Sequence, residues 1–340
     1  MVKVRPAARL VNSGASNPVT SARDTCDTAM LDPDIRRLLD TIFAVPPDSA
    51  APSIAQLRAA AEEAPRLLGG EPEVVASIRD LHAPGSAGAV PVRVYRPEST
   101  APQPLVLFAH GGGWVVGSLD SHDRLCRILA NRLSTILVAV DYRLAPEHIY
   151  PAALDDVEAA WRWARAEAHA LGADGERFAV AGDSSGGNLA AALTLRLHAQ
   201  GAAQPDLQLL LYPALDATCS LASYREFSTG YNLSGTQMAW YWDLYRGGAS
   251  PSAAELSPIA AAQLSDLSPA VIALAAADVL RDDGREYAQR LEAAGVPTRV
   301  VDCAGMIHGF LRWTGEVPAA LFWIDAIATA ARELLALRRV

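Results

Sequence analysis

A serine with a glycine two residues before it and another two residues after it is the feature of the chain most able to carry out chemistry. Ser184 lies between Gly182 and Gly186, after a short apolar run and before a helical pattern. A serine on a strained turn between strand and helix leaves no room for side chains at those offsets. The spacing selects Ser184 over Ser185 as the nucleophile, because Ser185 would need a glycine where the chain has Asp183.

A second glycine cluster indicates where negative charge would be stabilised during such a reaction. Gly111, Gly112 and Gly113 follow the apolar strand pattern at 105–109 and precede Trp114. A backbone without side chains can direct its N–H groups at an oxygen on which charge develops. The cluster could also be an ordinary flexible turn, but its combination with the serine motif favours an oxyanion hole.

A serine hydroxyl needs a general base, and the base needs an acid that fixes its orientation. The expected chain order for a serine on this kind of turn is serine, acid, histidine. Of the seven histidines, His198 lies in the helical pattern just after the serine. Only His308 lies far enough downstream to leave room for an acid, so we predict that His308 is the base.

Three aspartates are candidates for the acid. Asp278 follows the end of the apolar strand pattern at 270–275 most closely, and ligand-facing residues of open α/β sheets lie at such strand ends. Asp282 and Asp283 precede an amphipathic run, a position typical of residues that cap a helix. We therefore predict that Asp278 is the acid.

Together these motifs resemble the hormone-sensitive-lipase-like (bacterial family IV) carboxylesterases of the α/β-hydrolase superfamily. The resemblance implies a nucleophile, acid and base at Ser184, Asp278 and His308. It also implies oxyanion donors at the backbone amides of Gly112, Gly113 and Ser185. The resemblance runs from about 91 to about 310 and includes the segments 110–114, 141–147, 150–153, 182–187, 212–213 and 280–284.

The chain departs from that family at two positions. The family commonly has alanine after the nucleophile and proline after the acid, whereas this chain has Ser185 and Val279. Ser185 keeps the backbone N–H and adds a hydroxyl that could contact substrate. Val279 lacks the fixed φ of proline, which would loosen the loop that carries Asp278 without removing its carboxylate.

Composition and charge exclude several other classes of protein. The 340 residues carry a net charge of −9 with no basic run, which argues against a nucleic-acid partner. No segment has the length and apolarity of a membrane span, and the polar N-terminal stretch does not resemble a secretory signal. The chemistry calls for no metal or cofactor. The cysteines are scattered, which predicts reduced thiols in a cytoplasmic protein; they are Cys26, Cys126, Cys219 and Cys303.

Short apolar strand patterns alternate with helical patterns, which predicts a mostly parallel central sheet flanked by helices. The resemblance implies the α/β-hydrolase fold with a helical cap. We divide the chain into an N-terminal arm and cap helices at 1–72 and a catalytic domain at 73–340, with a cap insertion at 219–255. Strands are predicted at 74–80, 91–96, 104–109, 136–140, 177–181, 207–211, 270–276 and 297–302, and helices near 120–132, 154–170, 187–200, 284–295 and 318–337.

Aromatic residues gather in the insertion, where they could be ordinary core or could wall a substrate pocket beneath the cap. We predict an N-terminal arm at 1–27 and two helices between 34 and 68. The predicted pocket residues are Trp114, Asp183, Tyr212, Phe227 and Tyr231.

Several of these polar and aromatic residues also have a structural interpretation. Asp183 could bond to nearby backbone, and Trp114 could cover the end of the sheet. His110 precedes the glycine run and would hold that loop rather than act as a second base. Arg143 and Glu147 would brace the loop that follows the strand at 136–140.

We predict a serine carboxylic ester hydrolase that acts on short- to medium-chain acyl esters through an acyl-enzyme. An amidase or lactonase using the same three residues is an alternative. A ligand-binding protein without activity on the same fold is another, because fold does not fix function. The expected partner is a small-molecule ester, and the sequence leaves open whether the protein forms a homodimer.

The choice of nucleophile can be tested by substituting each serine in turn. Ser184→Ala should abolish hydrolysis of p-nitrophenyl butyrate, leaving only the roughly 10³–10⁴-fold acceleration that binding and an oxyanion hole provide without a nucleophile. Ser185→Ala, the matched control, should remain active because it keeps the backbone N–H. The opposite pattern in initial rates would place the nucleophile at Ser185.

Overall fold

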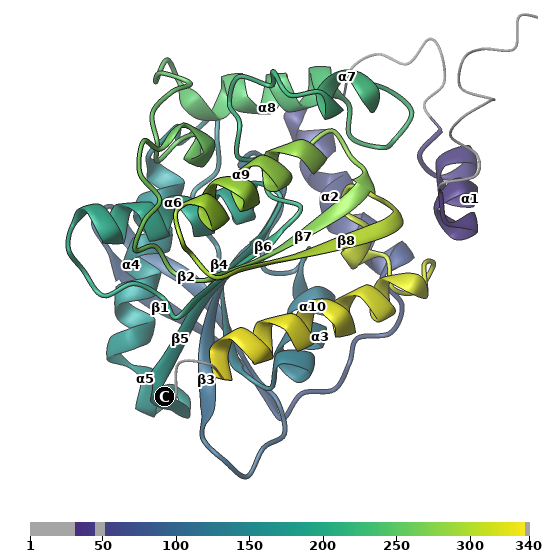
Figure 1. The fold of residues 1–340 in the computed structure, drawn as a ribbon. Helices are drawn as coiled ribbons and strands as arrows, with labels where there is room; N and C mark the ends of the chain where they lie inside the picture. The colour runs from purple at the N-terminus through teal and green to yellow at the C-terminus, as the bar shows by residue number, and fades with distance from the viewer. Residues whose placement is uncertain (1–30, 45–51, 337–340) are drawn as a thin grey trace, which may run out of the picture.

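Eight predicted strands become the strands of one sheet in the computed structural model, which describes residues 31–44 and 52–336 (Figure 1). The predicted arm at 1–27 lies outside the described residues. In chain order the strands are β1 (Ser77–Gly85), β2 (Gly88–Arg96), β3 (Gln103–Ala109), β4 (Ile136–Val140), β5 (Ala173–Asp183), β6 (Leu207–Leu211), β7 (Ala270–Ala277) and β8 (Thr298–Ile307).

The strands lie in the order β1-β2-β4-β3-β5-β6-β7-β8. β1 and β2 form an antiparallel hairpin, β2 pairs antiparallel with β4, and every other neighbouring pair is parallel. β3, β4 and β6 are buried along their whole length, which explains why they are continuous apolar runs rather than alternating patterns. The parallel pairing places the carboxyl ends of β3, β5, β6, β7 and β8 at the same edge of the sheet.

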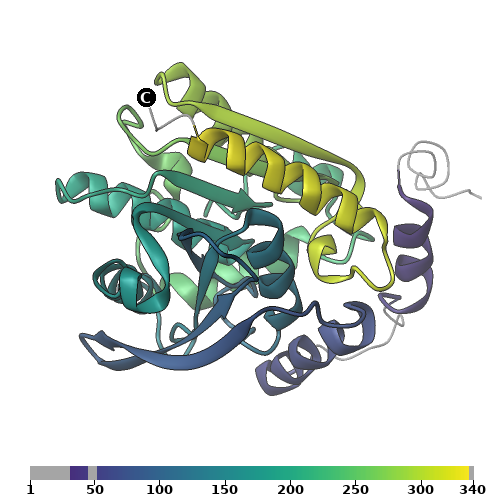
Figure 2. The ribbon, with the colours of Figure 1, turned by 90° about the horizontal axis from the view of Figure 1, so that it is seen from below.

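Helices cover both faces of this sheet. Figure 1 shows α6 and α9 above the sheet and α3 and α10 below it, and Figure 2 looks onto α10 from below. α3 and α10 also pack against each other, and α4 packs against α6. The bounds of these helices are α3 (Asp123–Leu133), α4 (Ala152–Ala166), α6 (Ser185–Ala199), α9 (Arg281–Ala293) and α10 (Ala319–Ala336).

The remaining helices come from the N-terminal region and from the insertion after β6. Two of them begin with a capping box, in which a serine and a glutamine three residues later satisfy each other's backbone N–H groups: Ser53 with Gln56, and Ser234 with Gln237. Short helical turns complete the described chain. The elements are α1 (Pro33–Thr41), α2 (Ile54–Leu68), α5 (Ala168–Leu171), α7 (Ser223–Glu226), α8 (Gly235–Arg246), η1 (Pro258–Ala260) and η2 (Phe310–Arg312).

Helices α2 and α8 both contact segments at the carboxyl edge of the sheet. The Arg58 guanidinium of α2 donates hydrogen bonds to the carbonyls of Val115 (2.9 Å) and Ala145 (3.1 Å). Tyr241 of α8 lies so close to Gly113 that a Cβ on the glycine would overlap the tyrosine ring. Segments far apart in the sequence therefore meet at this edge.

The structure corrects some predicted boundaries. β8 continues to Ile307 rather than ending at 302, because its ladder with β7 resumes after an irregularity between Ala275 and Ala277. β1 occupies 77–85 rather than 74–80, since its partner in the hairpin is β2 over its full length. The helix expected at 154–170 is divided into α4 and α5. No described helix combines the length and apolarity that crossing a bilayer requires.

Candidate active site

Three side chains from the ends of three strands form one chain of hydrogen bonds. Ser184 follows β5, Asp278 follows β7 and His308 follows β8. Nε2 of His308 lies 2.9 Å from Oγ of Ser184, and Nδ1 of His308 lies 2.7 Å from Oδ2 of Asp278. The fold thus brings together the three residues that were selected from the sequence by glycine spacing, chain order and position at a strand end.

The backbone at Ser184 has a strained conformation, with φ 55° and ψ −119°. Residues other than glycine rarely adopt positive φ, and such strain is typical of functional sites. A Cβ at Gly182 would overlap the backbone of Gly186, and a Cβ at Gly186 would overlap the backbone of Ala109. The turn therefore requires glycine at both positions, for the steric reason inferred from the spacing.

Asp278 is buried, and both of its carboxylate oxygens have hydrogen-bond donors. Oδ2 faces His308, while Oδ1 accepts from the backbone N–H of Leu280 (3.0 Å). The Ser223 hydroxyl donates to the carbonyl of Val279 (2.6 Å). These two bonds hold the loop in place although Val279 lacks the fixed φ of a proline.

The other two candidate acids serve a different purpose. Asp282 accepts from the backbone N–H of Ser223 (2.9 Å), and Asp283 accepts from those of Leu215 (2.8 Å) and Asp216 (2.9 Å). Burial raises the pKa of Asp283 well above its usual range. Asp282 thus ties the start of α9 to the insertion, and Asp283 ties it to the segment that follows β6, rather than only capping their own helix.

The glycine run after β3 forms a tight turn that only glycine can adopt without strain. Gly112 has φ 126° and Gly113 has φ 59°, and the carbonyl of Gly112 accepts from the N–H groups of Val115 (3.1 Å) and Val116 (3.0 Å). Within the described chain, the N–H groups of Gly112, Gly113 and Ser185 donate to no protein acceptor. These three donors are available to a ligand oxygen.

His110 stabilises this turn from one side. Its Nδ1 donates to the carbonyl of Gly111 (2.8 Å), and its ring stacks on Tyr142 with 4.3 Å between centroids. Tyr142 Oη donates in turn to the carbonyl of His110 (2.7 Å). Burial lowers the pKa of His110 to about 3, so the ring is neutral at physiological pH. This agrees with a structural role and not with a second base.

Asp183 has internal contacts instead of the predicted position in a substrate pocket. Its side chain is buried, and Oδ1 accepts from the Gly111 N–H (2.7 Å) and lies 3.2 Å from Nε2 of His122. Burial favours the neutral acid, but the charge and hydrogen-bonding capacity of His122, the charge of Arg312 and the Gly111 N–H lower the pKa of Asp183 to about 2. The ionised carboxylate joins the serine turn to the glycine turn.

Among the predicted aromatic pocket residues, Tyr212 lies nearest to the three hydrogen-bonded side chains. Its ring is edge-on to that of His308, with 5.0 Å between centroids. Trp114 is fully buried and stacks on Tyr245 at 4.3 Å and an interplanar angle of 3°, so it belongs to the core between the glycine turn and α8. The pair predicted in the insertion is also packed: Phe227 is edge-on to Tyr231 (5.1 Å) and lies beneath the Arg281 guanidinium (4.9 Å).

The polar residues predicted to brace the loop after β4 do so. Arg143 forms an ion pair with Asp156 (2.8 Å), and Glu147 forms one with Arg58 of α2 (2.7 Å). The hydrogen bond from Arg58 lowers the pKa of Glu147 to about 2. Since Arg58 also donates to the carbonyl of Val115, this one side chain connects α2 to both the loop after β4 and the glycine turn.

Sequence reasoning missed three residues that contact the site from elsewhere: Arg58, Tyr241 and His122. Their contacts join segments that are distant in sequence, so no local spacing identified them. The described cysteines Cys126 and Cys303 are buried free thiols and Cys219 is a half-buried one. Among the described residues, no group of three or more histidines, cysteines or carboxylates is placed to hold a metal ion.

Comparisons with known proteins agree with this geometry. The family model of the α/β-hydrolase fold matches residues 106–312. A carboxylic ester hydrolase of Mycobacterium tuberculosis, LipN, is 39% identical over 319 residues, covering 90% of this chain and 82% of that protein. The ethyl acetate hydrolase of Pseudomonas putida is 41% identical over 260 residues, covering 74% and 81%. A solved ester hydrolase from the metagenome of Lake Arreo superposes with a TM-score of 0.85 at 36% identity, covering 92% of this chain and all of the other.

The assignment of the acid can be tested with two asparagine variants. Asp278→Asn should lower kcat by on the order of 10⁴, because an amide favours the wrong tautomer of the histidine. Asp282→Asn is the matched control and should leave kcat nearly unchanged, since Asp282 makes no hydrogen bond to His308. Equal losses of kcat in the two variants would contradict the assignment.

The ionised state of Asp183 predicts a pH-dependent contribution to stability. An aspartate in an unfolded chain has a pKa of about 3.9, whereas the pKa of Asp183 in the fold is about 2. The carboxylate therefore stabilises the folded state fully above about pH 5, and this contribution is lost as pH falls through 4 toward 2. Urea unfolding of wild type and Asp183→Asn should show a constant difference in free energy at neutral pH that narrows below about pH 4. A difference independent of pH would contradict this.

Proposed function

This chain belongs to the α/β-hydrolase family and is a carboxylic ester hydrolase, and we propose that Ser184, Asp278 and His308 carry out its reaction. The observation that carries the proposal is the hydrogen-bonded chain from Ser184 Oγ through the imidazole to Asp278, with heavy-atom distances of 2.9 and 2.7 Å. We further assign the protein to the hormone-sensitive-lipase-like group, on the strength of the glycine run and the serine motif.

In the first half of the proposed reaction, His308 Nε2 accepts the proton of Ser184 as Oγ attacks the ester carbonyl carbon. Asp278 accepts a hydrogen bond from Nδ1–H, which fixes the tautomer and stabilises the imidazolium. The carbonyl oxygen becomes an oxyanion bound by the N–H groups of Gly112, Gly113 and Ser185. The imidazolium then gives its proton to the leaving alcohol, and an acyl-enzyme remains.

In the second half, water replaces the alcohol. His308 accepts a proton from the water as its oxygen attacks the acyl carbonyl, and the same three N–H groups stabilise the second oxyanion. The tetrahedral intermediate collapses, the carboxylic acid leaves, and Ser184 recovers its proton from the imidazolium. Apart from the ester and the water, each step uses groups of this chain.

The electrostatic setting favours charge on the oxyanion. Ser185 is the first residue of α6, so its N–H is one of the unpaired donors at the positive end of a helix dipole of 15 residues. Preorganised donors in a site of this kind are typically worth about 10²–10³ in kcat each. The helix contributes this field without any side chain.

We propose that α2 in the N-terminal region and α8 in the insertion at 219–255 act as the cap over this site. Three contacts support the proposal: Arg58 binds the carbonyl of Val115, Tyr241 lies against Gly113, and the Asn232 amide donates to the carbonyl of His308 (3.5 Å). The proposed pocket wall is accordingly centred on Tyr212 and Tyr241, while Trp114, Phe227 and Tyr231 support it from behind.

A cap this close to the glycine turn at 111–113, which we call the oxyanion turn, favours small acyl groups. We therefore propose short- to medium-chain acyl esters as substrates. Ser184 is only 7% exposed, which leaves little room for a long chain without movement of the cap. The relative named an ethyl acetate hydrolase is consistent with this preference. No observation favours an amidase or lactonase, and a homodimer and a cytoplasmic location stay predictions.

The proposal is tested by measuring kcat/KM for p-nitrophenyl esters from acetate to palmitate. We expect a maximum between acetate and hexanoate, followed by a decline of at least 10-fold by laurate, since each additional methylene that cannot be accommodated loses binding of about 0.8 kcal/mol. Labelling by an aryl phosphonate should occur in wild type and not in Ser184→Ala. Preference for emulsified long-chain esters would contradict the substrate class, and an unlabelled, inactive wild type would contradict the assignment of the reaction to these residues.

A further inference from the structure

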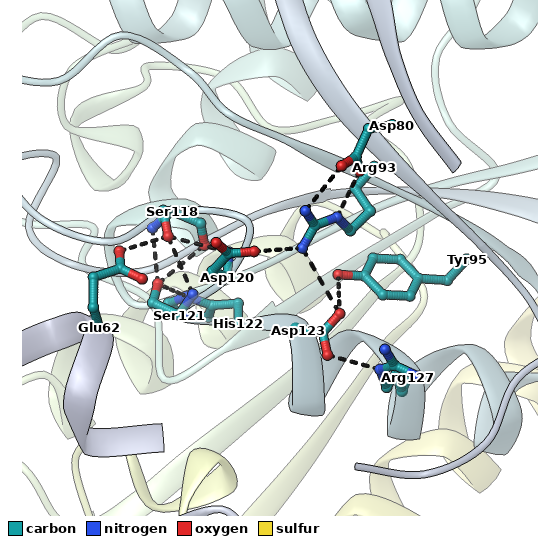
Figure 3. A network of polar contacts seen from close by, with 10 residues as sticks. All are labelled: Glu62, Asp80, Arg93, Tyr95, Ser118, Asp120, Ser121, His122, Asp123 and Arg127. Atoms are coloured by element: carbon teal, nitrogen blue, oxygen red, sulfur yellow. Dashed lines mark hydrogen bonds and ion pairs between the residues drawn. The ribbon is translucent and has the colours of Figure 1, made fainter. Parts of the chain in front are cut away.

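A series of hydrogen-bonded polar residues, buried at Asp183, His122 and Ser121 and half-buried at Ser118 and Glu62, leads from the glycine turn at 111–113 to helix α2. It begins at Asp183, continues through His122, Ser121 and Ser118, and ends at Glu62 of α2. Figure 3 shows the part from His122 to Glu62, with the side chains directed toward one another across the loop that precedes α3. None of these residues belongs to the hydrogen-bonded chain of Ser184, His308 and Asp278.

The first links of this chain set the position of the Gly111 amide. Asp183 Oδ1 accepts from the Gly111 N–H at 2.7 Å, and the same oxygen lies 3.2 Å from His122 Nε2. Asp183 and His122 are each only 1% exposed, so no solvent competes for the carboxylate. A buried charge without a partner costs several kcal/mol, which makes His122 necessary for keeping the carboxylate in place beside Gly111.

The other ring nitrogen of His122 fixes the direction in which the ring donates. Nδ1 lies 2.9 Å from Ser121 Oγ, which itself can donate to the Ser118 carbonyl at 3.0 Å. If the Ser121 hydroxyl donates to Nδ1, the proton of a neutral ring is on Nε2. If it donates to the carbonyl, Nδ1–H also donates and the ring carries two protons. An ionised Asp183 can only accept, so it favours the two arrangements that place a proton on Nε2. Nε2 lies within ion-pair distance of Asp183 Oδ1, at an angle outside ordinary hydrogen-bond geometry.

The chain then reaches α2 through two hydroxyl groups. The backbone N–H of Ser118 donates to Ser121 Oγ (2.8 Å), and the Ser118 hydroxyl donates to Glu62 Oε1 (2.6 Å). Glu62 lies one helical turn after Arg58, on the same face of α2. Arg58 donates directly to the carbonyl of Val115 (2.9 Å). Helix α2 therefore contacts the oxyanion turn along two routes, one through Arg58 and one through Glu62 and Ser118.

A second branch anchors the same loop to the sheet. The backbone N–H of Asp120 donates to Ser118 Oγ (3.1 Å), and the Asp120 carboxylate accepts from Arg93 of β2 (2.7 Å), as Figure 3 shows. Arg93 also forms an ion pair with Asp80 of β1 (2.6 Å). Because this branch holds Ser118 against the β1–β2 hairpin, a change in the contact with α2 acts on the rotation of the hydroxyls and of His122 rather than on the whole loop.

We propose that His122 is a positioning residue for the oxyanion turn and that Glu62 makes this positioning depend on the docking of α2. The inference rests on the function proposed above. When α2 is docked, Glu62 orders Ser118, Ser121 and His122, and Asp183 holds the Gly111 amide so that the next two amides face the oxyanion. When α2 is displaced, the oxyanion donors lose this support although the three catalytic side chains are intact.

The central test removes the donor of His122 and then restores it. His122→Leu should lower kcat by roughly 10- to 100-fold with little change in KM, the range expected when a remote change displaces a catalytic group. His122→Gln should recover most of this loss, because its amide nitrogen reaches the position of Nε2. His122→Asn is too short to reach Asp183 and should remain slow. Equal kcat values for the glutamine and asparagine variants would overturn the proposal, even if His122→Leu does not fold.

A transition-state analogue separates positioning from general stability. The affinity for an alkyl boronic acid, which forms a tetrahedral adduct with the serine, should fall in His122→Leu by the same factor as kcat/KM. The inhibition constant of the product carboxylate, which forms no such adduct, should stay within about 2-fold of wild type. A parallel loss of both affinities would indicate general damage to the site and would overturn the proposed role.

The dependence on α2 is tested by a matched pair on that helix. Glu62→Ala should lower kcat by roughly 3- to 10-fold without changing KM. Glu63→Ala removes a neighbouring exposed carboxylate whose ion-pair contact is with Arg66 (3.7 Å), and it should leave kcat unchanged. Equal kcat values in the two variants would overturn the role of Glu62. Failure of the proposed function is distinct from all these outcomes, because it would leave the wild type itself inactive.

Discussion

The backbone conformation of Ser184 is the constraint from which the rest of the site follows. A φ of 55° at a residue other than glycine persists only where surrounding contacts oppose relaxation. Here the Ser184 N–H donates to the carbonyl of Leu211 (2.8 Å), while its own carbonyl accepts from Asn188 (3.1 Å) and Ala214 (3.2 Å). The end of β6, the first turn of α6 and the segment just after β6 together hold the serine, so the strained turn is a product of the tertiary structure.

Three buried aspartates around this site show how partners decide the state of a carboxylate. Asp278 has the imidazole of His308 on one oxygen and a backbone N–H on the other. Asp183 faces His122 and a backbone N–H, and the pKa of Asp183 falls to about 2. Asp283 has two backbone N–H groups but no cation, and burial therefore raises the pKa of Asp283. In the proposed reaction the same type of side chain thus orients the base at Asp278 and holds the glycine turn at Asp183, while at Asp283 it joins a helix to a loop.

The sequence predicted the parts of the site that depend on local geometry. The glycines around Ser184 reveal a close approach of backbone to backbone. Chain order selected His308 and the position at a strand end selected Asp278, and the fold places the two within hydrogen-bonding distance. The strand patterns were likewise correct for all eight strands of the described sheet, apart from boundaries. Each of these features can be recognised from a pattern a few residues long, or from the order of elements along the chain.

The residues that escaped prediction act across long separations in the sequence. Helices α3, α4 and α5 and strand β4 lie between His122 and β5, the strand that ends at Asp183. Arg58 contacts a carbonyl that is 57 positions away. Asp183 was predicted to line a pocket, but its side chain is buried against Gly111. That burial depends on the pairing of β3 with β5, which no residue adjacent to Asp183 in the sequence indicates. Side-chain contacts of this kind depend on packing that a linear pattern does not contain.

The close approach at Gly186 has a consequence for how this enzyme can diversify. A side chain there would overlap the backbone of Ala109, and one at Gly182 would overlap that of Gly186. Only glycine is therefore tolerated at these two positions. Variation in selectivity must therefore come from segments whose side chains do not hold this turn, such as α8. A combinatorial library directed at the insertion would sample functional variants, whereas one directed at the turn would mostly sample misfolded chains.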